Sequence, residues 1–450
     1  MLFASIIVDI SVKQLDRPFT YIIPDKLKDI EEGTCVRVPF GRGNRLIEGY
    51  VIDIMDETTY DTSKDNFKLK EIHSIVKDKV KVEERLIKTA AFIRKTTGST
   101  MNAAMKVVMP VKMNVKFKEE KILSCDISSD TFKDAYATAV RRKYSAQLKV
   151  FNAINSESKI LDFKKGVNYK SFREKYDLAN STLKALSDKG VIRLESYNVL
   201  RNPYENLERE DNNILLNDEQ NEVKDSILEE YDRGDLRPAL IHGVTGSGKT
   251  AVYIELIKEM INRGKTAILL IPEIALTLQN LKRFNNEFGD KCSVIHSKLS
   301  HGERFDRFEA VKRGEIKVMI GPRSALFTPF QNIGIIIIDE EHETGYRSET
   351  TPKYHAIEVA EYIAKTENAK LVLGSATPSV KSYRNAVDGK YTYHSLMKRA
   401  FSSAVLPRVQ VVDMREELKN YNRSIFSNEL KRLMNEKLAK GEQIMLFINR

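Results

Sequence analysis

A glycine-rich segment in the middle of the chain constrains its fold most strongly. Residues 243–250 read Gly-Val-Thr-Gly-Ser-Gly-Lys-Thr, and they separate an apolar run at residues 239–242 from helical spacing at residues 251–263. Glycines let backbone amides turn inward around phosphate oxygens, and the start of a helix adds the positive end of its dipole. The segment therefore predicts a triphosphate site between a strand and a helix, with Lys249 at the β- and γ-phosphates and Thr250 on Mg²⁺.

From residue 215 onward, short apolar runs alternate with segments of helical periodicity. The runs expected to be buried strands cover residues 239–242, 267–271, 292–296, 317–320, 335–338 and 371–374. Continuous apolar strands separated by helices are typical of a parallel sheet covered on both faces. The sequence therefore predicts an α/β domain around the phosphate-binding segment.

One of these runs ends in a cluster of acids, because residues 339–342 read Asp-Glu-Glu-His. A nucleotide on an open parallel sheet lies at the carboxyl ends of the strands. Asp339 can there hold Mg²⁺ while Glu340 orients or deprotonates the attacking water. Two acids after an apolar run would, taken alone, usually mark a solvated strand end. Next to the glycine-rich segment they predict hydrolysis.

The chain before this domain predicts smaller units. Short β-branched runs broken by turn residues, from about residue 3 to residue 77, predict a β-rich module followed by an amphipathic helix at residues 81–96. The lysine-rich stretch at residues 105–121 is expected to lead out of this module. Residues 201–213 are polar and charged, which suits a linker.

Residues 141–204 contain three stretches with helical spacing and then an apolar run. The helices are expected at residues 145–154, 171–176 and 181–189, and the strand at residues 191–195. This order resembles a winged helix, whose third helix can enter the major groove of DNA through Asn180, Thr182 and Lys184. A role in protein contact or spacing stays open, because winged helices also serve those purposes.

The composition of the 450 residues favours a nucleic acid as partner. Lys plus Arg number 73 against 63 Asp plus Glu, which leaves a formal net charge of +10 and favours a polyanion. Cys35, Cys125 and Cys292 are far apart, so neither a disulfide framework nor a zinc site is predicted in this chain. No apolar run approaches the roughly 18 residues that cross a bilayer, so we expect no membrane partner and a cytoplasmic, nucleoid-associated protein.

The motifs together resemble those of superfamily 2 helicases. Residues 339–342 match the second motif of these enzymes, and residues 374–379 resemble the third. Residues 272–279 and 321–327 are similar to the elements that grip a single-strand backbone, and residues 217–220 to the element that reads adenine.

Three segments, at residues 271–277, 321–324 and 447–450, narrow the resemblance to the PriA family of primosomal replication restart helicases. The resemblance implies an ATP-driven 3′-to-5′ DNA helicase that recognises stalled or branched forks and initiates primosome assembly, with ATP and Mg²⁺ as cofactors. Its implied partners are forked DNA with a 3′ end, single-stranded DNA, helicase-loading proteins and single-strand binding protein.

The resemblance also assigns residues to the nucleotide site. Those implied to hold the nucleotide are Gln220, Gly243, Thr245, Gly246, Ser247, Gly248, Lys249 and Thr250. The implied catalytic residues are Lys249, Asp339, Glu340 and His342, with Thr250 and Asp339 holding Mg²⁺. His342 would couple the nucleotide state to the third motif. Ser375 and Thr377 would link that state to a DNA strand held by Arg323 and Ser324.

Residues 344–355 match in place the aromatic-rich loop by which such helicases sense single strands. Tyr346 and Tyr354 would stack on bases, an interaction that does not depend on the base sequence, and Arg347 and Lys353 would contact phosphates. A polar surface loop that happens to carry two tyrosines is the alternative interpretation.

In the amino-terminal module, Phe19, Gly41 and Lys70 correspond to residues that line a pocket for the 3′ end of a nascent strand in the family. Thr20 stands where an acid can follow the phenylalanine in the family, which leaves open how the terminal hydroxyl is held. An ordinary β-core aromatic is an equal alternative for Phe19.

The predicted domains are a β-rich 3′-end-binding domain at residues 1–115, a winged helix at 140–205, a RecA-like helicase lobe at 206–396 and the beginning of a second RecA-like lobe at 397–450. The family continues with the rest of the second lobe and a Zn²⁺-binding insertion, so we expect a C-terminally truncated chain that binds ATP and DNA but unwinds weakly or not at all. In the family the second lobe also supplies an arginine to the ATP site. An arginine that reaches the transition state raises the rate about 10³–10⁵-fold, so a chain without it should hydrolyse ATP poorly.

A fork-binding scaffold with a regulatory nucleotide site, or another superfamily 2 translocase, are the alternatives. Replacing Glu340 by glutamine separates the first of these from a motor, because only a motor loses its function.

Overall fold

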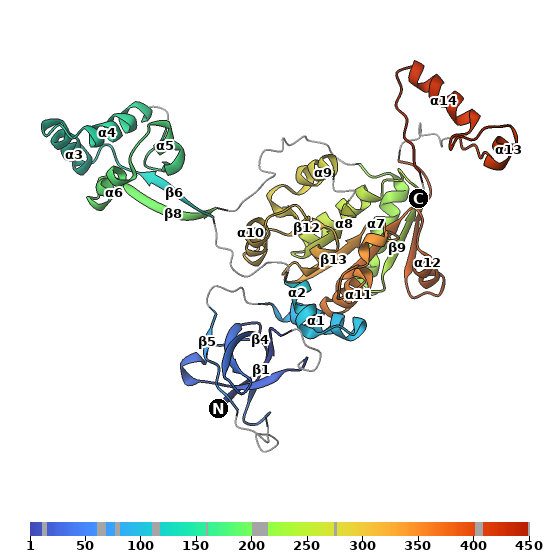
Figure 1. Cartoon of the computed structure of the whole chain (residues 1–450), viewed down its shortest axis with the longest axis horizontal. Coiled ribbons are helices and arrows are strands. Elements are labelled where there is room, and N and C mark those ends of the chain that lie inside the picture. Colours follow the sequence, from blue (N-terminus) through green and yellow to red (C-terminus); the bar gives the residue numbers. More distant parts are fainter. Residues whose placement is uncertain are drawn as a thin grey trace. The chain divides into compact units, whose positions relative to one another are not determined.

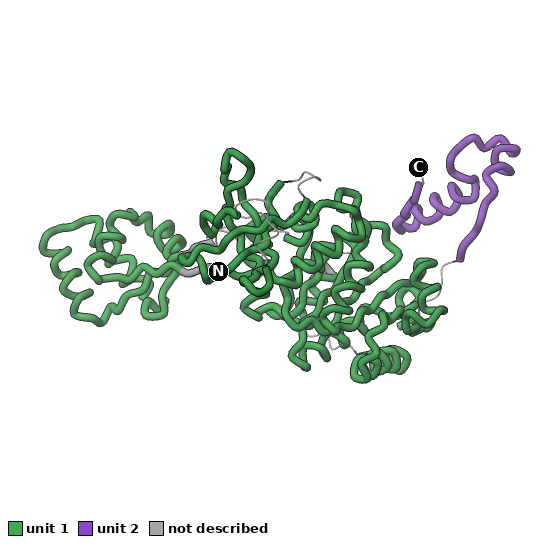
Figure 2. Tube along the Cα trace, turned by 90° about the horizontal axis from the view of Figure 1, so that it is seen from below, with its two compact units in different colours: residues 1–400 green, residues 401–450 purple. Residues whose placement is uncertain are grey.

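The computed structural model describes residues 1–10, 16–60, 69–76, 82–109, 118–158, 161–199, 215–273, 277–400 and 408–448 (Figure 1). The chain divides into two compact units, Met1–Ala400 and Phe401–Arg450 (Figure 2). Among the described residues, none of the helices has the length and apolarity that a membrane crossing requires. The predicted linker at residues 201–213 and the centre of the predicted strand-gripping segment, residues 274–276, lie outside the described residues.

The amino-terminal module is an antiparallel sheet with the strand order β2-β1-β4-β3-β5. Its strands are β1 (Leu2–Val8), β2 (Phe19–Ile23), β3 (Cys35–Phe40), β4 (Arg45–Asp56) and β5 (Ser74–Ile75). Alternation sends Val36 and Val38 into the core and leaves Arg37 exposed between them, as expected for a sheet with one buried face. The prediction of a β-rich module is confirmed.

Two helices follow this sheet, α1 (Glu84–Thr97) and α2 (Met101–Val108). Gly98, in the left-handed conformation at φ 64°, ends α1, and the side chain of Thr100 caps α2 by accepting from the amide of Ala103. The predicted helix at residues 81–96 is α1. The sequence did not predict α2, which begins before the stretch expected to leave the module.

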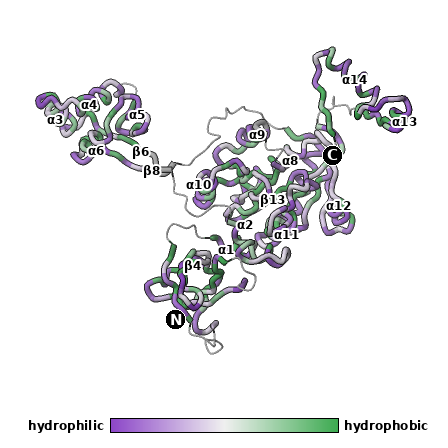
Figure 3. The backbone as a smooth tube through the Cα atoms, in the orientation of Figure 1, coloured by the Kyte–Doolittle hydropathy of each residue, from purple (hydrophilic) through white to green (hydrophobic). Residues whose placement is uncertain are grey.

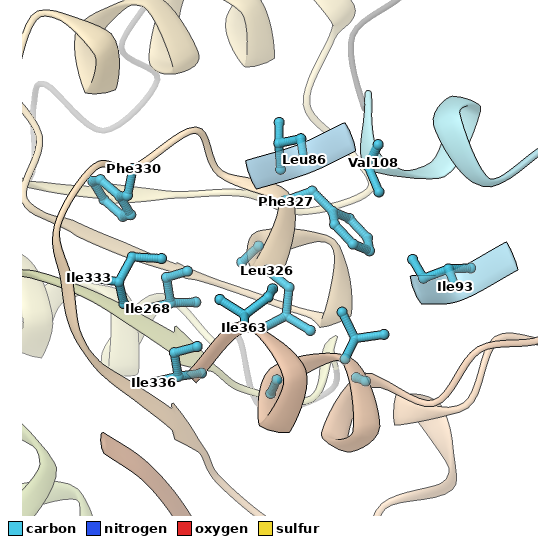
Figure 4. Packing of buried hydrophobic residues seen from close by; sticks show 14 of the residues in the cluster. Leu86, Ile93, Val108, Ile268, Leu326, Phe327, Phe330, Ile333, Ile336 and Ile363 are labelled. Atoms are coloured by element: carbon cyan, nitrogen blue, oxygen red, sulfur yellow. The ribbon is translucent and has the colours of Figure 1, made fainter. Parts of the chain in front are cut away.

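One apolar cluster joins these helices to both neighbours. It contains Tyr50 from the sheet, Leu86 and Val108 from the helices, and Phe327 from the α/β domain (Figure 4). Phe92 of α1 also stacks on Tyr362, with ring centroids 4.3 Å apart. The helices therefore pack between the amino-terminal sheet and the α/β domain.

Residues 118–199 contain a sheet with the order β7-β6-β8 and four helices. The elements of this region are β6 (Lys118–Ser124), α3 (Asp130–Arg141), α4 (Ser145–Glu157), β7 (Val167–Asn168), α5 (Tyr169–Lys175), α6 (Asn180–Asp188) and β8 (Arg193–Val199). The predicted three helices and final strand correspond to α4, α5, α6 and β8. In addition, β6 and α3 precede them and share their core through Leu123 and Phe132.

The α/β domain is a seven-stranded parallel sheet with the order β11-β12-β10-β13-β14-β9-β15. The strands are β9 (Ala239–Gly243), β10 (Thr266–Leu270), β11 (Cys292–Val294), β12 (Val318–Gly321), β13 (Ile333–Ile338), β14 (Lys370–Ser375) and β15 (Thr392–Leu396). The helices are α7 (Asp218–Asp232), α8 (Lys249–Asn262), α9 (Leu278–Phe288), α10 (His301–Lys312), α11 (Ala356–Glu367) and α12 (Val380–Val387). The predicted parallel α/β domain is confirmed, and β15 is the strand that the sequence did not predict.

Successive residues of the central strands enter two different cores. Ile336 and Ile338 of β13 belong to the core on the side of α11, whereas Ile335 and Ile337 belong to the core on the side of α8. Figure 3 shows the contrast along the chain between hydrophobic strands and hydrophilic outer segments such as α12. Burial on both faces explains the uninterrupted apolar runs in the sequence.

The unit Phe401–Arg450 contains α13 (Met414–Lys419) and α14 (Asn428–Ala439). This unit falls in the predicted beginning of a second RecA-like lobe, but residues 409–413 and 443–448 are not in strands. Val411 and Phe447 there are about nine-tenths exposed.

Candidate nucleotide site and DNA-binding residues

The glycine-rich segment forms a tight loop between β9 and α8. Gly246 and Gly248 have φ values of 78° and 86°, a conformation that favours glycine. The buried ammonium of Lys249, the first residue of α8, donates to the carbonyl oxygen of Gly243 at 2.8 Å. The loop therefore has the backbone conformation and the buried cation that a phosphate group requires.

Gln220, the predicted adenine reader, is anchored to this loop. Its Nε2 donates to the carbonyl oxygen of Ser247 at 2.8 Å, and its Oε1 accepts from the amide of Asn217 at 3.0 Å. A Cβ atom on Gly248 would lie 2.2 Å from that Nε2. The structure thus gives Gln220 a structural role, the attachment of α7 to the phosphate loop.

The acids of the second motif lie at the carboxyl end of β13, and in the sheet only β14 separates β13 from β9. Asp339 faces α8, because the hydroxyl of Tyr253 donates to its Oδ1 at 3.1 Å. Burial and the neighbouring charge of Glu340 raise the pKa of Asp339 to about 6, although the Tyr253 hydrogen bond and Lys249 act in the opposite direction. The two predicted parts of the nucleotide site therefore meet in space.

The donors present fit Mg²⁺. Within the described part of the chain, no group of three or more histidine, cysteine or acidic side chains forms a metal cage. A hydroxyl on Thr250, a carboxylate on Asp339 and several waters and phosphate oxygens form the kind of set that Mg²⁺ takes in nucleotide sites.

The side chain of His342 connects the second motif with the third. Its Nδ1 lies 2.7 Å from Oγ of Ser375, and this Oγ also accepts from the amide of Thr377 at 3.0 Å. The same Nδ1 lies 3.6 Å from Oε2 of Glu340. Glu340 has a φ of 46°, a strained conformation for a residue with a side chain. The residues predicted to couple the two motifs are thus in contact.

Glu341, to which the sequence assigned no role, makes a second link between these motifs. It is buried, and its carboxylate accepts from the amide of Ser379 at 2.6 Å and from the hydroxyl of Ser382 at 2.9 Å. These bonds hold the start of α12 against the end of β13. In the sequence, the only indication of this role was the presence of a third acid in the Asp-Glu-Glu-His cluster.

The aromatic-rich loop requires a correction. Tyr346 and Tyr354 are only 2% and 5% exposed, so neither ring can stack on a base in this structure. Tyr346 instead donates to the carbonyl oxygen of Asp339 at 2.6 Å, and Tyr354 packs edge-on against Phe327. Both rings fill the apolar core beneath the loop, where burying a ring is more favourable than leaving it in water.

Arg323, predicted to grip DNA, holds this loop. Its Nη1 donates to the carbonyl oxygens of Gly345 and Arg347 at 3.0 and 2.9 Å. Ser324 is half-buried beside it, while the side chains of Arg347 and Lys353 are exposed. The predicted phosphate contacts of Arg347 and Lys353 are compatible with this exposure.

The structure brings the three predicted residues of the 3′-end pocket together. Phe19 packs edge-on against Phe40 with ring centroids 5.0 Å apart, and Lys70 Nζ donates to the carbonyl oxygen of Gly41 at 2.7 Å. The guanidinium of Arg17 lies 5.4 Å from the centre of the Phe19 ring. Phe19 is half-buried, so part of its ring belongs to the core and part faces solvent.

On α6, the predicted groove-reading helix, the amide oxygen of Asn180 already has two donors. Tyr169 donates to it at 2.6 Å and Arg173 at 3.0 Å. Lys184 is exposed and Thr182 half-buried. Asn180 therefore joins α5 to α6.

Two family models match the chain. A 3′ DNA-binding domain (3′BD) of PriA matches residues 5–110, and the family described as type III restriction enzyme, res subunit, matches residues 213–380. The first covers the amino-terminal pocket and the second covers the phosphate loop and the acidic cluster.

Curated relatives match the whole chain. Replication restart protein PriA of Bacillus subtilis (strain 168) is 34% identical over 100% of this chain and 62% of its own length. The protein of the same name from Chlamydia muridarum is 32% identical over 100% of this chain and 58% of its own length. The chain thus spans about three fifths of these relatives. Among solved structures, RecG bound to a three-way DNA junction matches with 18% identity and a TM-score of 0.38, covering 51% of this chain and 29% of its own, a likeness too weak to support a conclusion.

Proposed function

Sequence identity over its whole length makes this chain a relative of the replication restart protein PriA, and from that relationship we propose that it contains the ATP-binding and DNA-binding parts of a replication restart helicase. The enzyme would hydrolyse ATP, move along DNA in the 3′-to-5′ direction and recognise stalled or branched forks. The DNA substrate would be a fork with a free 3′ end and single-stranded DNA. Helicase-loading proteins and single-strand binding protein would be its partners at the primosome.

The observation that carries the proposal is the meeting of the phosphate loop with the acidic cluster. Lys249 begins α8, Asp339 follows β13, and the hydroxyl of Tyr253 joins α8 to Asp339 at 3.1 Å. A phosphate-binding loop facing two strand-end carboxylates is the arrangement that nucleotide hydrolysis uses.

In this proposal the residues of the chain divide the work of hydrolysis. Lys249 would leave the carbonyl oxygen of Gly243 and bind the β- and γ-phosphates, and Glu340 would accept a proton from the attacking water. Thr250 and Asp339 would hold Mg²⁺, which neutralises charge on the phosphates when bound. His342 would report the state of this site to Ser375.

In the amino-terminal module, the 3′ end would enter between Phe19, Gly41 and Lys70. A base can stack on the exposed part of the Phe19 ring, and the ammonium of Lys70 can meet a phosphate. The bond from Lys70 to Gly41 holds that ammonium beside the turn.

The test is the substitution Lys249→Ala in the 450-residue chain. Removing a charged hydrogen-bond donor to phosphate costs about 1.5–3 kcal/mol, so magnesium-dependent ATP binding measured by calorimetry should weaken about 10- to 150-fold. Lys70→Ala is the matched control, because it removes the same charge from the amino-terminal module and should leave ATP binding unchanged. ATP binding that survives Lys249→Ala would rule out the proposed nucleotide site.

A further inference from the structure

Tyr253 lies where three motifs of the nucleotide site meet. It comes one turn after Lys249 on α8, and its side chain is only 1% exposed. Its hydroxyl donates to Oδ1 of Asp339 at 3.1 Å. On the other side, the hydroxyl lies against Gly374, because a Cβ atom built there would be only 1.6 Å from it.

The hydroxyl is not needed to fill space. A phenylalanine would occupy nearly the same volume without bringing a polar atom into the core, and burying a hydroxyl is unfavourable unless it forms a hydrogen bond. The absence of a side chain at Gly374 makes room for the oxygen, and Asp339 provides its acceptor. The hydrogen bond to Asp339 is therefore what a tyrosine provides at this position and a phenylalanine would not.

Resting on the function proposed above, we propose that Tyr253 is a positioning residue that fixes the carboxylate of Asp339 for Mg²⁺. The Tyr253 hydroxyl holds Oδ1, so in this proposal Oδ2 is the carboxylate oxygen that binds Mg²⁺. Tyr346 holds the backbone of the same residue through its carbonyl oxygen at 2.6 Å. The two tyrosines thus restrain the backbone and the side chain of Asp339 separately.

Groups that orient a metal ligand change metal affinity without touching the metal. Replacing them typically weakens metal affinity about 10- to 100-fold. Because Tyr253 restrains only one of the groups expected to hold Mg²⁺, we expect an effect at the lower end of this range. Nucleotide bound without Mg²⁺ does not use Asp339, so its affinity should not change.

The experiment compares Tyr253→Phe with the unmodified 450-residue chain. The measurement is the Mg²⁺ concentration that half-saturates binding of a fluorescent ATP analogue, together with the affinity for that analogue in EDTA. We expect the half-saturating concentration to rise about tenfold and the affinity in EDTA to stay within twofold. A half-saturating concentration within twofold of the unmodified chain would overturn the inference.

Tyr391→Phe is the matched control. It removes another buried hydroxyl from the same domain, one that donates to Glu361 on α11 and lies outside the nucleotide site. Both variants should lower the melting temperature by a similar amount, whereas only Tyr253→Phe should change the Mg²⁺ dependence. An equal change in both variants would show a general packing effect and overturn the inference.

A double-mutant cycle tests whether Tyr253 acts through Asp339. In an Asp339→Asn background, Tyr253→Phe should change the Mg²⁺ requirement by less than twofold. A full tenfold effect in that background would overturn the inference. Should the unmodified chain show no magnesium-dependent binding of nucleotide, the proposed function itself would be wrong, and this outcome is distinct from a failure of Tyr253 alone.

Discussion

The α/β domain and the amino-terminal module place their charged side chains in opposite ways. In the α/β domain, Lys249, Glu341 and Lys370 are each less than a tenth exposed and bonded to oxygen or nitrogen atoms. In the module, Arg17 is exposed and Lys70 half-buried. In a parallel sheet covered on both faces, polar groups reach solvent mainly at the strand ends, whereas an antiparallel sheet can leave more of its surface in water. Single contacts should therefore be worth several kcal/mol in the domain and much less in the module.

The largest effect is expected at Lys370, whose side chain is fully buried in the α/β domain. Its ammonium lies 2.8 Å from Glu230 and also donates to the carbonyl oxygens of Asp235 and Arg237. Lys370→Met keeps most of the volume but leaves the carboxylate of Glu230 buried without this partner. We expect the free energy of unfolding, measured by urea denaturation at pH 7, to fall by about 3–5 kcal/mol.

Lys381→Met is the control, because Lys381 makes an exposed ion pair with Glu358 at 3.0 Å and its loss should cost less than about 1 kcal/mol. Equal losses in the two variants would contradict the contrast between buried and exposed charges.

The same pair predicts the pH dependence of stability. Burial raises the pKa of Glu230, but hydrogen bonds from His394 and Lys370 outweigh it and lower the pKa to about 2. A carboxylate whose pKa is lowered in the folded state adds stability above its unfolded value near 4.5, and this stability is lost as the pH falls toward 2. In Lys370→Met the folded-state pKa of Glu230 should lie closer to 4.5, so the variant should lose less stability than the unmodified chain as the pH falls, which denaturation curves between pH 3 and pH 6 would show. Curves of the same shape for both proteins would contradict this coupling.

The two regions also differ in how far the sequence predicts them. In the α/β domain, contiguous segments predicted the phosphate loop and Asp339, and the family resemblance implied that His342 couples to the third motif, which agrees with its contact with Ser375. The role of Tyr253 was not predicted, because the sequence of a helix does not show which of its buried residues contacts a residue of another motif, here Asp339. Glu341 was missed because three adjacent acids do not show which of them turns inward.

The aromatic-rich loop shows a further limit of the sequence. The match in place to the aromatic-rich loop of the family predicted that Tyr346 and Tyr354 stack on bases, and the polar composition of the segment gave no indication that the rings are buried. Whether an aromatic ring of a loop faces water depends on a space in the core beneath it, here the one beside Phe327. That space is formed by elements distant in sequence, α1 and α2 among them.

In the amino-terminal module, the substitution Phe19→Ala should have a medium effect. Stacking of one base on an aromatic ring is worth about 1–3 kcal/mol, so affinity for single-stranded DNA with a free 3′ end should fall about 5- to 150-fold. Fluorescence anisotropy with 5′-labelled strands whose 3′ end is either free or blocked would measure this. Lys249→Ala, in the other region, should leave this affinity unchanged. Equal binding by Phe19→Ala and the unmodified chain would show that Phe19 is an ordinary core aromatic.

The smallest effect is expected at Arg17, whose guanidinium lies 5.4 Å from the centre of the Phe19 ring. A cation over a ring at an exposed site is worth about 0.5–1 kcal/mol, so Arg17→Gln should weaken binding of a 3′ end two- to fivefold. Arg17→Lys keeps the positive charge but removes the planar guanidinium. A loss of affinity in Arg17→Lys would therefore indicate the contact with the Phe19 ring, and no loss would indicate charge alone. If Arg17 also meets a phosphate, the slope of log affinity against log salt should fall by about 0.7 for Arg17→Gln and stay unchanged for Arg17→Lys. A loss larger than that of Phe19→Ala would contradict the expectation that exposed charges of the module contribute less than its half-buried ring.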